Sequence, residues 1–320
     1  MKRGAGIVSV GDELLAGRVL DTNAHRLSSA LRAAGFPVMA RATVGDDPPR
    51  IAAAIRAARA EAAAVVVTGG LGPTKDDLTR EGVALALGVP LRRSAAAEAM
   101  LRATYERLGR PVPPGSEVQA DLPEGCEPVK NLRGTAPGLL FEDDDGVLFV
   151  APGVPSELDG MLAENLLPTL ARRPERGPAP HLRQVTLAGV TEAVAGNLVA
   201  DLMTRGRDPI VGSYPKQGRV VLALESFAEP PDEAERRLDR DVATIRARLA
   251  ESVVGDGDVP LQEVVARLLL ERGLTFALAE SMTGGAVADA LVEVPGISAS
   301  FLAGYVTYSN RAKRDALGVP

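Results

Sequence analysis

The chain has 320 residues, of which 46% are hydrophobic and 24% charged, with a formal net charge of −6; this composition is typical of a globular protein with two or three domains. One cysteine and two histidines exclude an intrachain disulfide and argue against a structural zinc site, a Ser-His-Asp triad or a multi-histidine metal centre. With no tryptophan, no long basic run and an acidic balance, the sequence also predicts no direct binding of nucleic acid.

The first 90 residues alternate between continuous apolar runs and amphipathic segments. This region predicts strands at residues 4–11, 37–45 and 63–70, and helices at residues 22–35, 47–61 and 77–88. Thr22 or Asn23 is placed to cap the first helix, and Gly35 to end it. Strands that are apolar along their length and alternate with helices indicate an α/β fold with a doubly wound parallel sheet.

The rest of the chain divides at two segments rich in proline, glycine and charge, residues 172–180 and 251–260, which predict linkers. Before the first linker, a helix begins near residue 95, a hairpin turns at Asp145-Gly146, and another helix begins at Ser156. The sequence therefore predicts three domains: α/β at 1–171, small α+β at 181–250, and a further α/β segment at 255–320.

Two loops of the predicted sheet are candidates for binding an anion. In an open α/β sheet, ligands bind beyond the carboxyl ends of the strands, where the winding reverses, so the loops after the first and third strands are expected to be neighbours. The second loop is rich in glycine, which lets the backbone approach a ligand, and the helix after it directs its positive end to the same place. The candidate phosphate-binding residues of the two loops are Asn23, Gly69, Gly70, Gly72, Thr74 and Lys75.

The same loops carry carboxylates that suit a divalent cation bound through oxygen. We assign Asp12, Asp76 and Asp77 as candidate catalytic groups, and Asp12, Glu13 and Asp77 as candidate metal ligands. The alternative is a plain strand-to-helix turn, with Asp77 capping the following helix and Asp12 and Glu13 lying on the surface. Neither the dinucleotide fingerprint G-x-G-x-x-G nor the Walker loop is present.

Four motifs carry a family resemblance: VGDELLAGRVLDTN, TGGLGPTKDDLTRE, NLRGTAPG and PGVPSEL. They closely resemble the molybdopterin-binding-like domain of the CinA family (competence/damage-inducible protein A), and the first two are similar to pterin-binding loops of molybdenum-cofactor biosynthesis proteins. Asp77 matches the essential aspartate of those loops. Departures are Ala151, where a leucine is usual, and the residues before the Gly-Thr-Ala-Pro-Gly run.

The resemblance implies metal-dependent hydrolysis of ADP-ribose at its pyrophosphate, with a divalent cation of open identity and optionally a monovalent one. Such hydrolysis needs neutralised phosphate oxygens and an oriented water. Backbone amides, Lys75 and a cation would neutralise the phosphate oxygens, and a carboxylate among Asp12, Asp76 and Asp77 would hold the metal or position the water. Which carboxylate does which is open.

Residues 181–250 resemble the KH-like module of the family. A nucleic-acid-binding KH domain clamps backbone with a G-x-x-G loop between helices, and this segment has none there. We therefore favour a packing or dimerisation module, and the resemblance implies a homodimer.

The segment LAESMTGGAVADAL holds a second candidate site. A strand is expected to end at Glu280 and a helix to begin at Ser281, with Thr283, Gly284 and Gly285 in its first turn. A hydroxyl beside free backbone N–H groups suits an oxyanion or a phosphate. An ordinary Ser or Thr helix cap is the alternative.

Together with GYVTYSNRAKRDALGV, this segment resembles the start of the family's nicotinamide-nucleotide amidase domain. The resemblance implies Ser281 as the nucleophile on the carboxamide of nicotinamide mononucleotide, with Tyr308 or Lys313 as proton acceptor; a lysine base requires a lowered pKa. Met282 stands where the family commonly has cysteine. Because the family's domain continues past residue 320, we expect a truncated, loosely packed and inactive amidase domain.

The sequence also predicts where the protein is located, and it leaves two other function classes open. No apolar run reaches the ~20 residues of a membrane span, and the N-terminus turns acidic too early for a signal peptide, so we expect a cytoplasmic protein that binds no membrane. Two alternatives to the hydrolase stay open. One is a non-catalytic pterin- or nucleotide-binding protein; the other is an interaction protein in competence or recombination that acts through a protein partner.

Overall fold

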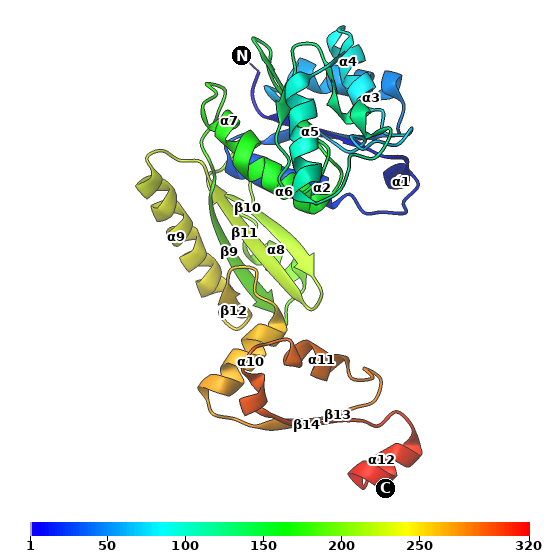
Figure 1. Cartoon of the computed structure of the whole chain (residues 1–320). Coiled ribbons are helices and arrows are strands. Elements are labelled where there is room, and N and C mark those ends of the chain that lie inside the picture. The colour runs from blue at the N-terminus through cyan, green and yellow to red at the C-terminus, as the bar shows by residue number, and fades with distance from the viewer. Residues whose placement is uncertain (1) are drawn as a thin grey trace. The chain divides into compact units, whose positions relative to one another are not determined.

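The structure is a computed structural model, and it describes residues 2–320 (Figure 1). The chain forms two compact units, the first ending at Pro180 and the second comprising His181–Pro320. Within the described residues, no helix has the length and apolar character needed to cross a membrane.

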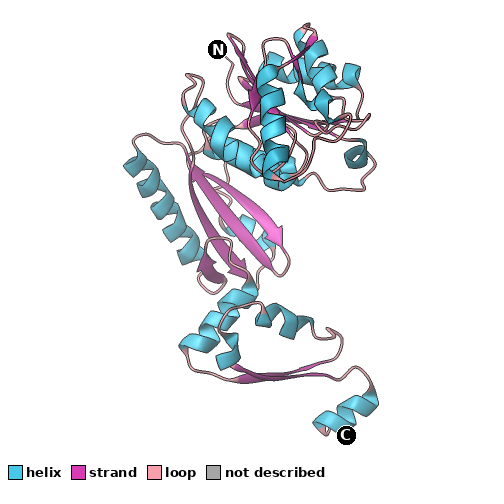
Figure 2. Cartoon of the chain, in the orientation of Figure 1, coloured by secondary structure: helices cyan, strands magenta, loops and turns pink. Residues whose placement is uncertain are grey.

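The first unit is built on a six-stranded sheet with the order β2-β1-β3-β8-β7-β6 (Figure 2). The strands are β1 (Ala5–Val10), β2 (Val38–Val44), β3 (Ala64–Thr68), β6 (Glu127–Val129), β7 (Gly138–Asp143) and β8 (Gly146–Ala151). Strands β2, β1, β3 and β8 run parallel, and the β7–β8 hairpin adds an antiparallel edge. This confirms the α/β fold class with its mostly parallel sheet.

Helices cover both faces of this sheet. The helices of the unit are α1 (Asp12–Leu15), α2 (Thr22–Ala33), α3 (Pro48–Glu61), α4 (Thr79–Leu87), α5 (Ala95–Arg107), α6 (Pro155–Met161), a π-helical segment (Leu162–Leu166) and α7 (Leu167–Ala171). A 3₁₀ turn (Ser116–Ala120) and the two-stranded sheet of β4 (Leu91–Arg93) and β5 (Asp121–Pro123) complete the unit.

Strand β1 shows why its sequence is apolar throughout. Ile7 packs with Leu27 of α2 and Leu158 of α6 in one core cluster, whereas Val8 packs with Ile51 of α3 in the other. Successive side chains of a strand point to opposite faces, so a strand covered on both sides is apolar at every position.

The helix caps differ from the expectation in two places. Asp21, rather than Thr22 or Asn23, caps α2, because its side chain accepts a hydrogen bond from the Ala24 N–H (2.9 Å). Helix α4 begins at Thr79 with Leu78 at the N-cap and no side-chain cap, so Asp77 does not cap it. Both Asn23 and Asp77 are thereby left for other contacts.

The second unit begins with a four-stranded antiparallel sheet of order β10-β11-β9-β12. Its elements are β9 (His181–Ala188), α8 (Glu192–Leu198), β10 (Ile210–Lys216), β11 (Arg219–Ser226), α9 (Pro231–Arg248) and β12 (Val253–Asp256). Strand β12 lies in the segment predicted as a linker. It forms because apolar Val253 and its neighbours pair with the free edge of β9.

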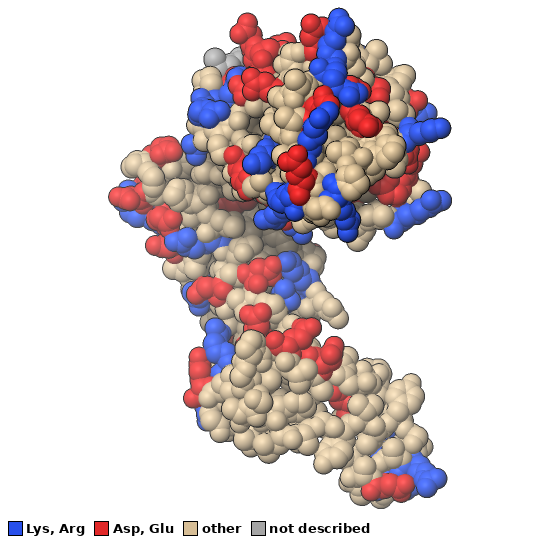
Figure 3. Space-filling model, in the orientation of Figure 1, with Lys and Arg blue, Asp and Glu red and all other residues tan. Residues whose placement is uncertain are grey.

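The elements after β12 enclose few apolar side chains. They are α10 (Leu261–Glu271), β13 (Phe276–Glu280), α11 (Ala286–Val292), a 3₁₀ turn (Ile297–Ala299), β14 (Phe301–Val306) and α12 (Asn310–Leu317), with β13 and β14 parallel. Val264, Ala266, Leu291 and Ile297 are buried, whereas Met282 is 90% exposed. This part of the surface is largely uncharged in Figure 3.

Candidate active site

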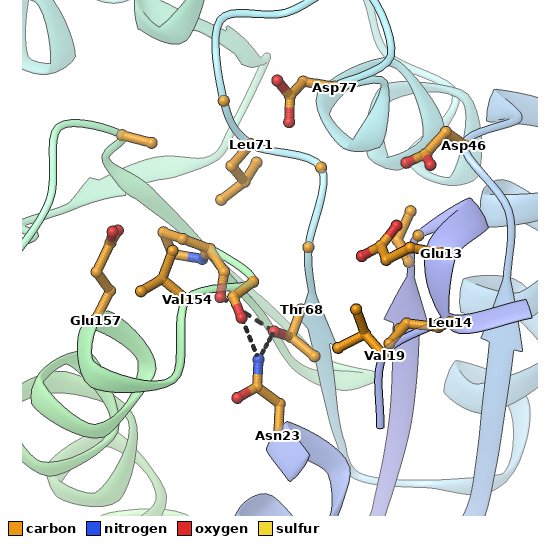
Figure 4. Close-up of a pocket in the computed structure, with 18 of the residues that line it drawn as sticks. Glu13, Leu14, Val19, Asn23, Asp46, Thr68, Leu71, Asp77, Val154 and Glu157 are labelled. Carbon is orange, nitrogen blue, oxygen red and sulfur yellow. Dashed lines mark hydrogen bonds between the residues drawn. The ribbon is translucent and has the colours of Figure 1, made fainter. Parts of the chain in front are cut away.

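A cavity of about 410 Å³ opens at the carboxyl ends of β1, β3 and β8 (Figure 4). Strand β1 lies between β2 and β3, so the chain winds away from it in both directions, and this is where open α/β sheets bind ligands. The lining comes from the loops after β1, β2, β3 and β8 and from the segment around Thr135. The two loops chosen from the sequence do meet here.

The glycine loop after β3 needs its glycines. Gly69 and Gly70 have positive φ angles of 108° and 61°. A Cβ at Gly69 would overlap the carbonyl oxygen of Val10, and one at Gly70 would overlap the Thr79 hydroxyl. Any other residue would therefore push the loop away from the end of β1.

Buried Arg80 orients the peptides of this loop. Its guanidinium donates to the carbonyl oxygens of Leu71 (2.7 Å) and Gly72 (3.0 Å), while the Thr79 N–H donates to the Gly70 carbonyl (3.1 Å). In a trans peptide the C=O of one residue points opposite to the N–H of the next, so the Gly72 N–H is turned away from Arg80 and the Leu71 N–H is turned away from the Thr79 N–H. Neither N–H has a hydrogen-bond partner among residues 2–320. Two backbone donors are thus available to an anion.

Asp77 is held over this loop. Its Oδ2 accepts hydrogen bonds from the backbone N–H of Thr74 (2.8 Å) and from the Thr74 hydroxyl. A Cβ at Gly72 would overlap the Asp77 carboxylate, so the glycine makes room for it. Asp76 and Asp77 both line the cavity, whereas Thr74 and Lys75 are exposed and lie outside its lining. The structure therefore does not bring Lys75 to the site.

Asp12 also lies outside the lining, and Asp46 takes the place expected for it. The Asp46 carboxylate accepts from the Asp12 N–H (2.9 Å), and the Asp12 carboxylate accepts from the Asp46 N–H (3.4 Å). These bonds turn Asp12 toward the loop after β2, while Asp46 and Glu13 line the cavity. The sequence signal for Asp46 was its place directly after a predicted strand next to β1.

Negative charge is concentrated around Asp46. Burial raises the pKa of Asp46, and repulsion from Asp12, Glu13 and Asp76 raises it further, against the hydrogen bond from the Asp12 backbone. A cation would relieve this repulsion.

The donor set fits a cation of the magnesium type. No group of three or more His, Cys, Asp or Glu side chains within residues 2–320 is placed to hold a metal ion by itself. Mg²⁺ is commonly bound by one or two carboxylates together with substrate phosphates and water. Asp46 and Glu13 are the residues that would hold such an ion next to the free N–H groups.

Asn23 links α2 to the end of β3 and to the loop after β8 at the cavity. Its Nδ2 donates to Thr68 Oγ1 (3.1 Å) and to the Gly153 carbonyl (2.7 Å), and the Thr68 hydroxyl donates to the Pro152 carbonyl (3.1 Å). Its Oδ1 is buried and has no partner among the described residues. An unpaired buried acceptor is costly.

Glu157 lies across the cavity from Glu13 (Figure 4). Its Oε2 accepts from Asn131 Nδ2 (2.6 Å), and its carboxylate lies where a Cβ of Gly134 would be. The motifs at residues 131–138 and 152–158 are therefore neighbours. Sequence reasoning missed Glu157, Asn131 and Arg80, although the motifs contained them.

The C-terminal candidate site differs from its prediction. Helix α11 begins at Ala286 with Gly285 at the N-cap, so Ser281 and Thr283 do not start it. Glu280 accepts hydrogen bonds from the N–H groups of Gly285 (3.0 Å), Val287 (3.1 Å) and Ala288 (2.8 Å). Of the N–H groups predicted to serve an oxyanion, that of Gly285 is thus occupied by a carboxylate of the chain itself.

The other residues of that site lie near the surface. The N–H of Gly284 donates to the Ser281 carbonyl (3.2 Å), and Tyr308 is 74% exposed. Lys313 lies on α12, where Ser309 caps the helix. The structure shows no hydrogen bond among Ser281, Tyr308 and Lys313 within the part of the chain it describes.

Three family models match the chain. Residues 6–172 match "Probable molybdopterin binding domain", residues 182–255 match "Damage-inducible protein CinA KH domain", and residues 258–320 match "CinA C-terminal domain". The fold and the cavity thus define an α/β protein of the molybdopterin-binding type, followed by two further domains.

Relatives agree over nearly the whole chain. A "CinA-like protein" of Frankia casuarinae is 41% identical over 98% of this chain and 75% of its own length, and one of Dictyoglomus turgidum is 37% identical over 98% and 76%. The chain belongs to the CinA family. Residues 258–320 match the C-terminal domain of the family, and the chain spans about three quarters of the length of these relatives.

Solved structures similar to the chain cover about half of it. CinA from Thermoplasma acidophilum is 36% identical over 51% of this chain and 95% of its own, with a TM-score of 0.48. The tungsten cofactor synthesizing protein MoaB from Pyrococcus furiosus is 18% identical over 53% of this chain and 98% of its own, with a TM-score of 0.35.

Proposed function

We propose that the chain is a hydrolase that cleaves the diphosphate of ADP-ribose in the cavity at the ends of β1, β3 and β8, with a divalent cation. The observation that carries the proposal is the pairing of free backbone N–H groups at Leu71 and Gly72 with crowded carboxylates at Asp46 and Glu13. The first group binds phosphate oxygens, and the second binds a cation.

In the proposed hydrolysis, the groups that line the cavity have separate roles. The N–H groups of Leu71 and Gly72 bind non-bridging oxygens of the diphosphate. A cation held by Asp46 and Glu13 would neutralise phosphate charge. Asp77, fixed by Thr74 through Oδ2, accepts through Oδ1 the proton of a water whose oxygen bonds to one phosphorus. The bridging P–O bond breaks, and AMP and ribose 5-phosphate leave.

The test is release of AMP from ADP-ribose by the purified chain across divalent cations, with and without a monovalent cation. Asp77→Asn and Asp46→Asn are each expected to lower kcat by about 100-fold or more, the scale of a lost acid–base or charge contribution. Asp47→Asn is the matched control. Asp47 caps α3 by accepting from the Arg50 N–H, and asparagine caps a helix equally well.

The outcome also decides between catalysis and binding alone. Tight binding of ADP-ribose without release of AMP under any cation would favour a non-catalytic nucleotide-binding protein. Equal losses in Asp47→Asn and Asp77→Asn would contradict the roles given to the cavity residues.

The match of residues 258–320 to the family's C-terminal domain supports a second candidate, amidase action on nicotinamide mononucleotide with Ser281 as nucleophile. Since Glu280 occupies the nearby N–H groups, Ser281 would need other donors for an oxyanion. Ammonia release that Ser281→Ala abolishes would support this activity, and release that it leaves unchanged would contradict it.

A further inference from the structure

A second cavity of about 480 Å³ lies along α5. We call it the α5 groove; it is formed by Ala99, Met100, Ala103 and Arg107 of α5 together with Lys130 and Thr135. The proposed mechanism leaves it without a role.

The α5 groove adjoins the catalytic cavity. Thr135 lines both of them. Asn131, which lines the groove, donates to Glu157, which lines the catalytic cavity (2.6 Å). A ligand whose diphosphate lies against the glycine loop can therefore extend past Thr135 into the groove.

The lining of the groove suits a flat aromatic ring attached to an anion. Ala99, Met100 and Ala103 give it an apolar floor, and a methionine thioether makes favourable contacts with aromatic rings. Arg107 and Lys130 are exposed at its rim, and neither forms an ion pair within residues 2–320. A guanidinium stacks on aromatic faces and attracts nearby negative charge.

We propose that the α5 groove binds the nucleobase of the substrate, so that the nucleoside half of a dinucleotide-like diphosphate is recognised by α5. This inference rests on the proposed function for the position of the diphosphate. It makes the enzyme selective for nucleoside diphosphate derivatives over inorganic diphosphate.

The experiment measures binding by calorimetry with the full chain and Mg²⁺, using AMP and inorganic pyrophosphate as probes. Arg107→Glu and Ala103→Glu are expected to weaken AMP binding about tenfold, a change of about 1.4 kcal/mol, and to leave pyrophosphate binding within about twofold. Arg110→Glu is the matched control, because Arg110 is exposed, makes the same charge change and lies outside the groove. With ADP-ribose, the groove variants are expected to raise KM and leave kcat nearly unchanged.

Unchanged AMP affinity in both groove variants, or an equal loss in Arg110→Glu, overturns the inference. Failure of the proposed function gives a different result: groove-dependent AMP binding with no hydrolysis of ADP-ribose, which leaves the nucleobase site standing. Hydrolysis of ADP-ribose with an unchanged KM in both groove variants overturns the nucleobase site and leaves the proposed function standing. Thermal melting of each variant checks that it is folded.

Discussion

At the scale of single residues, the hydrogen bonds of each carboxylate decide which ones reach the cavity. Asp12 and Asp46 exchange backbone-to-side-chain bonds, and only Asp46 lines the cavity. Asp77 has one oxygen fixed by Thr74. Acids on adjacent loops therefore differ in their contacts, which their positions in the sequence do not distinguish.

Because the pKa of Asp46 is raised, replacing this residue with a neutral one is expected to stabilise the folded protein, to an extent that depends on pH. Because the folded-state pKa lies above the unfolded value of ~3.9, ionisation of Asp46 costs folding free energy at neutral pH and costs nothing below that value. Asp46→Asn is expected to raise Tm at pH 7, without added cation, by about 2 °C. The gain should vanish near pH ~3. Calorimetry measures both, and a gain that persists in acid contradicts the cause given.

At the scale of elements, the conformation of the glycine loop depends on α4. Arg80 lies in the first turn of α4 and is 3% exposed, and burial lowers the pKa of its guanidinium. Its charge is stabilised by the loop carbonyls that it binds. The helix thus holds the peptides of the glycine loop in place through one side chain.

Arg80→Lys is expected to weaken binding of inorganic pyrophosphate by about tenfold or more. A lysine cannot reach two carbonyls in a fixed fork, and a lost partner for a buried carbonyl costs ~1–3 kcal/mol. Calorimetric titration measures the affinity. Arg50→Lys, on the exposed side of α3, is the control and should bind normally; equal affinity in all three proteins would show that Arg80 does not orient the loop.

Helix α11 gives a second prediction at this scale. Burial raises the pKa of Glu280, but hydrogen bonds from Thr283 and from three backbone N–H groups outweigh this, so the net pKa is lowered. A lowered folded-state pKa means that these bonds stabilise the helix end above the unfolded pKa of ~4.3 and are lost as pH falls through the folded value.

Glu280→Gln is therefore expected to speed hydrogen exchange of the amides of Gly285, Val287 and Ala288 by about tenfold at pH 7. Exchange measured by mass spectrometry or NMR tests this. Glu293→Gln, at the exposed C-terminal end of the same helix, should leave those amides as protected as in the unchanged chain. Protection that survives Glu280→Gln would show that the carboxylate does not fix the helix end.

At the scale of the whole molecule, each of the three apolar core clusters lies inside one unit. On the face shown in Figure 3, Lys and Arg are interspersed with Asp and Glu over the first unit.

The predicted linker at residues 172–180 is hydrogen-bonded to the first unit. The Gly177 N–H donates to the Gly35 carbonyl (2.9 Å), and Arg176 donates to the Ala34 carbonyl (3.1 Å).

A fragment of residues 2–180 is expected to fold by itself and to bind inorganic pyrophosphate like the full chain. A fragment of residues 2–171 should melt a few degrees lower, because it lacks the bonds at Gly35 and Ala34, each worth ~0.5–1.5 kcal/mol. Thermal melting compares the two. Equal Tm values would show that the segment after residue 171 adds no stability.

The amino-acid sequence was sufficient to predict the parallel α/β sheet, because strands covered on both faces are apolar at every position, as in residues 64–68. It also determined which loops meet, since β1 and β3 end at the same sheet edge, and so it placed Glu13, Asn23 and Asp77 at the cavity. Those conclusions need only periodicity and the topology of parallel strands.

The rest of the site depends on contacts that form when the elements pack together. Asp46, Arg80 and Glu157 act through contacts with residues that local patterns do not pair with them: Asp12, the carbonyls of Leu71 and Gly72, and Asn131. In the same way, Glu280 rather than a ligand binds the N–H groups of α11. Hydrogen bonds are directional and short in range, so which partner a polar group finds depends on the packing that brings the elements together.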